Sequence, residues 1–121
     1  MSKRIIGAAI EVHKQMGPGL LESIYEVCML EELTLRGLKV DSQVPVSLVY
    51  KNKVLEKEYK LDLIVEDEII VELKAVETLL PIFEVQLLTY LRLMDKSLGL
   101  VLNFNEVLLK NGIRRVINGY N

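Results

Sequence analysis

Acidic and basic side chains interrupt two apolar runs of this sequence, in the stretch LDLIVEDEIIVELKA. The runs carry Asp62 in the first, and Glu72 and Lys74 in the second. Carboxylate oxygens are the ligands that Mg²⁺, Mn²⁺ and Ca²⁺ prefer, whereas zinc favours nitrogen and sulfur. The question is whether these residues form a site or only mark a solvated face of a sheet.

The alternation of the two runs predicts a hairpin with a defined register. Successive side chains of a strand point to opposite faces, and both runs place apolar residues at odd positions. A two-residue turn would put odd positions of one strand beside even positions of the other. A three-residue turn over residues 66–68 instead gathers the odd apolar positions on one face. Its pairs are Val65 with Ile69, Leu63 with Val71, and Leu61 with Leu73.

The same register places Asp62 opposite Glu72 and Lys60 opposite Lys74. Directly opposed like charges destabilise a sheet, so we expect the carboxylate pair to be compensated. One interpretation is a divalent cation bound between the carboxylates. The other is a solvated face on which each carboxylate pairs with a neighbouring lysine.

The remaining pattern predicts elements that hold this hairpin in one domain, residues 1–121. Helical spacing of apolar residues indicates helices before the hairpin, separated by Gly17-Pro18-Gly19 and ended by Gly37. Pro81 suits the first turn of a helix after the hairpin. The expected helices cover residues 3–15, 20–36 and 80–95, and the expected strands cover 43–50, 56–65, 69–76, 100–104 and 113–117, with a turn at 51–53.

Composition narrows the class of protein. The chain has 121 residues, of which 50% are hydrophobic, and a net charge of −2. No apolar run approaches the roughly 20 residues of a membrane helix, so we expect a cytoplasmic protein without membrane contact. Its one cysteine, Cys28, permits no internal disulfide, and its one histidine, His13, excludes a multi-histidine metal site. The acidic balance argues against a globally basic nucleic-acid surface, although local basic clusters remain at Arg114-Arg115 and Lys51-Asn52-Lys53.

Two further spacings bear on the hairpin. Gln86 and Tyr90, in EVQLLTYL, lie four apart on the helix that follows it and share a helical face. Glu22 and Tyr25, in GLLESIY, lie three apart on the second helix, one turn from each other. Taken alone, a first-turn glutamate is favoured by the helix dipole, and a tyrosine at such a position is ordinary core.

Together these residues resemble the PD-(D/E)XK nuclease superfamily, which places Asp on one strand and (D/E)-x-K on the next. The Q-x-x-x-Y resembles the additional motif of its exonuclease-like branch, and G-x-x-E-x-x-Y resembles the small GxxExxY proteins within the superfamily. The resemblance covers nearly the whole chain, from RIIGAAIEVHKQMG to NGIRRVING. The superfamily's proline is replaced by Leu61, a common departure.

The resemblance implies an α/β fold with a restriction-endonuclease-like core, in which a mixed central sheet is flanked by helices. It implies a metal-dependent nuclease that hydrolyses phosphodiester bonds, in DNA rather than RNA. Mg²⁺ or Mn²⁺ would be bound by Asp62, Glu72 and Glu22, with the carbonyl of Leu73 as an extra ligand. Lys74 would orient the attacking water or stabilise the transition state. Supporting roles are implied for Gln86, Tyr25, Tyr90, Lys60, Arg114 and Arg115.

Two other classes of function stay open at this point. A fold does not fix a function, so the chain is also compatible with a nucleic-acid-binding or regulatory module without turnover. The high apolar content of a small body is also compatible with an interaction protein that forms a homodimer. Metal binding separates the enzyme from the module, because only the enzyme requires it.

Overall fold

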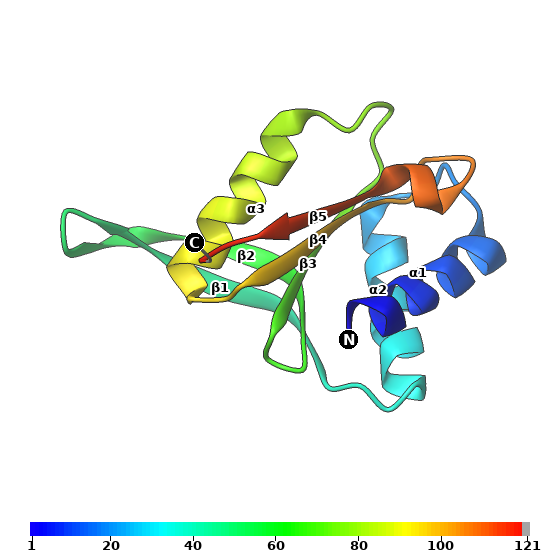
Figure 1. The fold of residues 1–121 in the computed structure, drawn as a ribbon, viewed down its shortest axis with the longest axis horizontal. Coiled ribbons are helices and arrows are strands. Elements are labelled where there is room, and N and C mark those ends of the chain that lie inside the picture. The colour runs from blue at the N-terminus through cyan, green and yellow to red at the C-terminus, as the bar shows by residue number, and fades with distance from the viewer. Residues whose placement is uncertain (120–121) are drawn as a thin grey trace.

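A five-stranded sheet with helices on both faces forms the fold in this computed structural model, which describes residues 1–119 (Figure 1). The strands lie in the order β1-β2-β3-β4-β5, and all neighbours are antiparallel except β3 and β4. Helix α3 supplies the crossover between that parallel pair. The mixed sheet flanked by helices confirms the predicted α/β class. In chain order the elements are α1 (Ser2–Met16), α2 (Glu22–Leu35), β1 (Val40–Tyr50), β2 (Lys53–Val65), β3 (Ile69–Lys74), α3 (Pro81–Met94), β4 (Leu98–Asn103), the 3₁₀ helix η1 (Leu109–Gly112) and β5 (Ile113–Ile117).

The helices begin and end close to the predicted positions. Helix α1 ends at Gly17, whose φ of 73° lies in the left-handed region that glycine adopts without strain. Pro81 occupies the first turn of α3, where its missing N–H is not needed. Helix α2 buries Tyr25, Met29 and Leu33, a narrower stripe than its apolar sequence indicates.

Two apolar cores lie on the two faces of the sheet. One packs beneath α1 and α2 and includes Leu63, Val71 and Leu100, and the other packs beneath α3. Gly99 lets α3 approach β4, because a Cβ at Gly99 would lie 2.8 Å from a methyl carbon of Leu87. The layers therefore depend on shape as well as on apolar pattern.

The prediction that Leu61 shares a face with Leu63 is wrong. Leu61 belongs to the core beneath α3, whereas Leu63 belongs to the core beneath α1 and α2, although both are odd positions of β2. The alternation breaks between them at Asp62. There the partner strand carries Gln43, a non-glycine residue with a φ of 52°.

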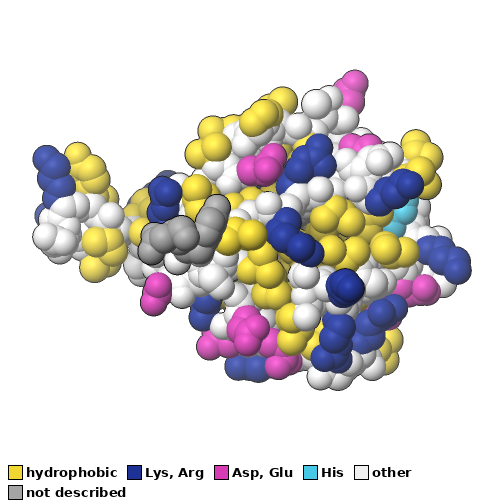
Figure 2. All heavy atoms as spheres, in the orientation of Figure 1, with side chains coloured by type: hydrophobic (Ala, Val, Ile, Leu, Met, Phe, Trp, Pro, Cys, Tyr) yellow, Lys and Arg dark blue, Asp and Glu magenta, His cyan; other side chains and the backbone are white. Residues whose placement is uncertain are grey.

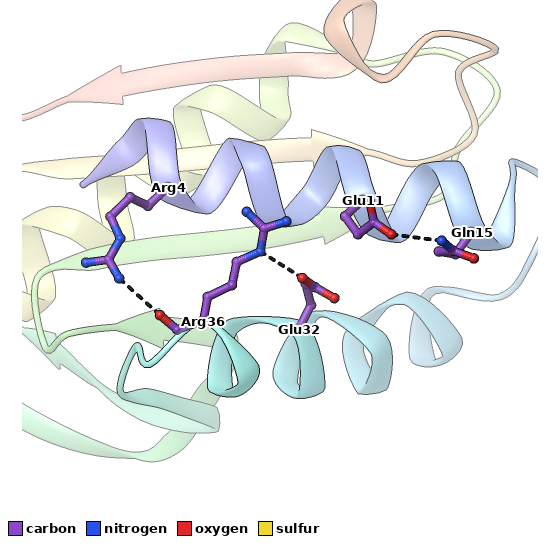
Figure 3. Close-up of polar contacts among 5 residues, drawn as sticks. All are labelled: Arg4, Glu11, Gln15, Glu32 and Arg36. Carbon is purple, nitrogen blue, oxygen red and sulfur yellow. Dashed lines mark hydrogen bonds and ion pairs between the residues drawn. The ribbon is translucent and has the colours of Figure 1, made fainter.

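Polar contacts join α1 and α2 on their outer side (Figure 3). Arg4 donates a hydrogen bond to the carbonyl of Arg36 at 3.1 Å, and the guanidinium of Arg36 pairs with Glu32 at 2.7 Å. Within α1, Gln15 donates to Glu11 at 2.8 Å. Of these three contacts, the one between Arg4 and Arg36 joins the two helices, the other two lie along one helix, and the predicted site is elsewhere.

The hairpin of β1 and β2 extends beyond the body of the molecule, at the left of Figure 1. Its turn has two residues, Lys51 and Asn52, and β2 begins at Lys53, earlier than the predicted residue 56. Both turn residues have positive φ, 50° and 63°, as a type I′ turn requires. Strand β1 ends at Tyr50 as predicted, whereas β2 begins three residues earlier than the sequence pattern indicates, and the two form a ribbon without a helix over it.

Candidate functional site: a fork between two strands

The predicted three-residue turn is confirmed, and the ladder it sets up is short. Val65 pairs with Ile69 and Leu63 with Val71, as the alternation requires. The ladder between β2 and β3 ends at that second pair. Beyond it the strands separate into a fork, and the next positions on the two strands are Asp62 and Glu72.

At the fork, carboxylates take the place of ladder carbonyls. The amide N–H of Asp62 donates to Oε2 of Glu72 at 2.9 Å, and the amide N–H of Leu73 donates to Oδ2 of Asp62 at 2.8 Å. Each carboxylate thus satisfies a backbone donor of the opposite strand. The pair is side by side as predicted, and it is fixed by the backbone rather than by lysine.

The lysine pairing predicted beside these carboxylates does not form. The ladder between β2 and β3 includes no pair of Lys60 with Lys74, and across their other edges Lys60 lies opposite Pro45 on β1 and Lys74 lies beside Asn103 on β4. Lys74 is half-buried, and its ammonium lies 4.6 Å from the centre of the Phe83 ring of α3. An aromatic face attracts a cation, so this contact fixes the lysine beside the fork.

Glu72 is almost fully enclosed, with 3% of its surface exposed. Burial raises its pKa from an ordinary 4.5 to about 7, and the charge of Asp62 adds to the rise. The hydrogen bonds from the Asp62 amide and the Tyr59 hydroxyl, together with the charge of Lys74, oppose it. An enclosed carboxylate whose neighbour is also acidic is a group that a cation would stabilise in its charged form.

Asp62 is only partly buried, and its surroundings extend to α2. Burial raises its pKa, and the amide of Leu73 opposes that rise. The charges of Glu26 and Glu22 raise the pKa further, whereas Lys74 lowers it. Negative charge from three elements, β2, β3 and α2, therefore converges on the fork.

Glu26 is a residue that the sequence interpretation missed. It lies one helical turn after Glu22, and that i, i+4 spacing was the available signal. Its Oε1 accepts a hydrogen bond of 2.8 Å from the side chain of Gln43, the residue with left-handed backbone beside Asp62. The contact links α2 to the kink in β1 next to the fork.

Tyr59 is the second missed residue, and it lies behind Glu72. Its hydroxyl donates to Oε1 of Glu72 at 2.8 Å, and its ring stacks on Tyr90 with centroids 4.3 Å apart. Burial and the neighbouring Glu72 raise the pKa of Tyr59, so it stays a donor. Tyr59 continues the odd-numbered apolar series of β2, which was its sequence signal. Tyr90 thus supports the site through Tyr59, and Gln86, one turn earlier on α3, is exposed.

Tyr25 has a structural position. It is fully buried and stacks on Phe104 at 4.5 Å. Its hydroxyl accepts from the amide of Leu20 at 3.0 Å and donates to the carbonyl of Gly17 at 2.6 Å. The tyrosine therefore fixes the loop that precedes α2, and with it the first turn that carries Glu22.

Arg114 and Arg115 do not form one basic surface. Arg114 lies 3.9 Å from Glu84 of α3, whereas Arg115 donates to the hydroxyl of Ser2 at 2.9 Å. They alternate along β5 and therefore face opposite sides of the sheet.

The donor set of the fork suits a hard divalent cation in its chemistry. Asp62 and Glu72 offer oxygen ligands only, and Glu22 and Glu26 add carboxylates from α2. Within residues 1–119, however, no three acidic, histidine or cysteine side chains are gathered as a ready metal cluster. A side chain of α2 would have to turn toward the fork to complete one. A separate hollow of about 470 Å³ borders Asp67 and Lys96 and contains none of the predicted site residues.

A comparison with protein families shows which family the chain belongs to. Residues 1–116 match the PD-(D/E)XK nuclease superfamily. The chain belongs to this superfamily. Searches of curated proteins and of solved structures found no match. Membership suggests a nuclease-type function and a nucleic-acid substrate, and nucleases of this superfamily typically use divalent metals. No helix among the described residues is long and apolar enough to span a membrane.

Proposed function

We propose that the protein is a Mg²⁺- or Mn²⁺-dependent nuclease that hydrolyses phosphodiester bonds in DNA, and that it belongs to the GxxExxY branch of its superfamily. The observation that carries the proposal is the fork. Asp62 and Glu72 are held side by side by the opposite strand's amides, and Lys74 lies next to them. A sheet that served only structure would gain stability from an apolar residue at the enclosed position of Glu72.

In the proposed reaction, water adds to phosphorus and one P–O bond breaks, which leaves a phosphate monoester and a hydroxyl. Asp62 and Glu72 would hold the cation, with Glu22 or Glu26 of α2 and the carbonyl of Leu73 as further ligands. When bound, the cation lowers the pKa of a coordinated water and neutralises charge on the phosphate. The ammonium of Lys74 either orients that water or stabilises the added negative charge.

The residues behind the fork act through position. Tyr59 donates to one oxygen of Glu72, which leaves the direction of that carboxylate fixed. Tyr90 supports Tyr59 by stacking, and Gln86 lies exposed one turn away, where it can contact a ligand or substrate. These three are positioning or contact residues rather than carriers of the chemistry.

One observation favours a second candidate, a nucleic-acid-binding module without turnover. Both oxygens of Glu72 already accept hydrogen bonds, from Tyr59 and from the amide of Asp62. Such a carboxylate can also serve as a structural bridge across the fork. The two candidates differ in metal binding, since the bridge requires no cation.

The test is calorimetric titration with Mn²⁺ of wild type, Asp62→Ala and the matched control Asp41→Ala, whose aspartate is exposed on β1. Cleavage of single- and double-stranded DNA is followed in the same buffers. We expect wild type and Asp41→Ala to bind Mn²⁺ and cut DNA, and Asp62→Ala to lose both. Equal metal binding by all three, with no cleavage of either substrate, would exclude the nuclease and favour the module.

A further inference from the structure

The outer part of the β1–β2 hairpin, residues 47–58, is here called the arm. It extends away from the body with no helix over it, and most of its residues are exposed (Figure 1). Large apolar side chains are among them: Val49 is 51% exposed, Tyr50 63% and Val54 64%. Val49 and Val54 lie directly opposite each other, and Tyr50 lies opposite Lys53. Exposed apolar side chains grouped on a ribbon indicate a surface that binds a partner.

The charges of the arm indicate the chemistry of that partner. Its tip carries Lys51 and Lys53, and residues 46–55 include no acidic side chain, in a chain whose net charge is −2. The arm's glutamates, Glu56 and Glu58, come later, toward the body, with Lys57 between them. Figure 2 shows basic and hydrophobic side chains together at the far end of the arm. A polyanion with apolar surface between its charges fits this tip.

We propose that the arm inserts into the major groove of duplex DNA and holds the duplex for the fork. The groove of B-form DNA is about 12 Å wide and admits a two-stranded β-ribbon. In that position Lys51, Lys53 and Lys57 contact phosphates along the groove walls. Val49 and Val54, which are paired on one face of the ribbon, contact base edges and thymine methyl groups, whereas Tyr50 lies on the opposite face beside Lys53.

The turn at the tip allows the charge of Lys51 to be removed without disturbing the backbone. Lys51 adopts a φ of 50°, a left-handed conformation that costs a non-glycine residue about 1 kcal/mol. Asparagine adopts this conformation more readily than lysine, and the next residue is already Asn52. Lys51→Asn therefore removes the charge and leaves the turn at least as stable, so the variant tests charge alone.

The arm is joined to the proposed catalytic residues by one continuous strand. Strand β2 starts at Lys53 in the tip, passes Tyr59, which contacts Glu72, and reaches Asp62 at the fork. At about 3.3 Å per residue the tip lies up to roughly 30 Å from the fork. This inference rests on the proposed nuclease function, to which it adds the form of the substrate, double-stranded DNA. An RNA duplex has a deep and narrow major groove and does not admit the ribbon.

The test measures binding to a labelled DNA duplex by fluorescence anisotropy, with EDTA present so that no strand is cut. The arm variant is Lys51→Asn/Lys53→Gln/Lys57→Gln. The matched control is Lys3→Gln/Lys14→Gln/Lys110→Gln, three exposed lysines of α1 and η1. Each lost phosphate contact lowers the slope of log affinity against log salt by about 0.9, which is roughly eightfold in affinity at 0.1 M salt. We expect the arm variant to lose on the order of 10²-fold in affinity and two to three units of slope, with the control within threefold of wild type.

Two results would overturn the arm proposal at this stage. Equal losses in the arm variant and in the control would mean that charge acts without regard to position. Equal affinity of wild type for DNA and RNA duplexes of one sequence would exclude insertion into the groove, since we expect at least tenfold preference for DNA.

A second copy of the chain is the other partner that would cover apolar side chains. Sedimentation of wild type and of Val49→Ser/Val54→Ser decides this. We expect both to be monomers in the absence of DNA. A wild-type dimer that becomes monomeric in the double variant would assign the arm to self-association and overturn the proposal.

Hydrolysis of bis(p-nitrophenyl) phosphate with Mn²⁺ separates failure of the arm from failure of the nuclease. This diester is too small to reach from the fork to the arm, so we expect wild type and the arm variant to hydrolyse it equally. Arm-dependent duplex binding without hydrolysis of any diester would exclude the nuclease and leave the arm as a DNA contact. If the arm variant hydrolyses duplex DNA and bis(p-nitrophenyl) phosphate at wild-type rates, the proposed role of the arm is excluded and the nuclease proposal stands.

Discussion

The inner and outer parts of strand β2 contrast sharply. The inner part, residues 61–65, lies between β1 and β3, and its apolar side chains are buried in the two cores. The outer part, residues 53–60, pairs with β1 alone and is exposed except at Tyr59. The boundary between them is the fork. One strand thus has a part that stabilises the fold and a part free for a partner, and the proposed chemistry lies where they meet.

Two lysines test the contrast with the largest expected effect. Lys74→Gln should lower kcat for duplex cleavage about 10²–10³-fold, because it removes a cation that lies beside the reacting phosphate. Lys53→Gln should leave kcat unchanged and weaken duplex affinity about eightfold at 0.1 M salt, because it removes one phosphate contact. Steady-state kinetics and anisotropy on both variants measure the two constants. A loss of kcat in both variants would remove the distinction between the two parts.

Apolar truncation tests the same contrast in stability. Leu63→Ala removes a fully buried side chain and should lower the free energy of unfolding by about 3 kcal/mol. Val54→Ala removes an exposed one and should change that free energy by less than about 0.5 kcal/mol. Urea denaturation compares the two. A large loss in Val54→Ala would mean that the arm contributes to the core.

The pH dependence of stability tests the boundary residue, Glu72. Its pKa is about 7 in the fold against an ordinary 4.5, so the folded state binds its proton more tightly than the unfolded state. The contribution of Glu72 to the free energy of unfolding is therefore fully present below pH 4.5. It is lost as pH rises through 7, by on the order of 3 kcal/mol. In metal-free buffer, Glu72→Gln should lack this loss, and Glu58→Gln on the exposed arm should keep it. Denaturation of all three between pH 4 and 8 gives the comparison, and a loss unchanged in Glu72→Gln would contradict it.

Tyr59 and Tyr50 of the β1–β2 hairpin test the contrast between its inner and outer parts, with the smallest expected effect. Tyr59→Phe keeps the stack on Tyr90 but removes a hydrogen bond to Glu72, which should cost about 1 kcal/mol of stability. The pKa of Glu72 should rise further, since that hydrogen bond lowers it. Tyr50→Phe, at the arm tip, should change neither quantity. Carboxyl chemical shifts followed against pH report the pKa, and a fall in Tyr59→Phe would refute the positioning role.

The inner part of the hairpin was predictable because its sequence constrains it twice. The alternating apolar residues on both sides of residues 66–68 favour one turn length, and the structure has that turn and buries Leu63, Val65, Ile69 and Val71 in one core. The same constraint set Asp62 next to Glu72. The order of the elements is compatible with an α/β or an α+β domain, and the resemblance of the motif residues to the PD-(D/E)XK superfamily favoured the α/β class.

The surroundings of the site were not predictable in the same way. The register between β1 and β2 has no such constraint, because their outer residues are exposed and a shift occurs between Ser47 and Val49. Tyr59, Gln43 and the face of Leu61 all depend on that register. The position at which β2 and β3 separate was not predictable, because no local pattern of side chains specifies where a ladder ends.

The tyrosine and the glutamate of the G-x-x-E-x-x-Y pattern have different roles. The tyrosine closes the loop before α2 by its contacts with Gly17 and Leu20, and so it maintains the fold. Only the glutamate of the pattern, Glu22, bears on the charge of the fork. A relative that carries another residue in place of Glu22 would therefore keep the fold and lose one acidic group near the proposed site. The pattern alone therefore marks common descent, and under the proposed function it is Asp62, Glu72 and Lys74 that would distinguish a nuclease from a relative without turnover.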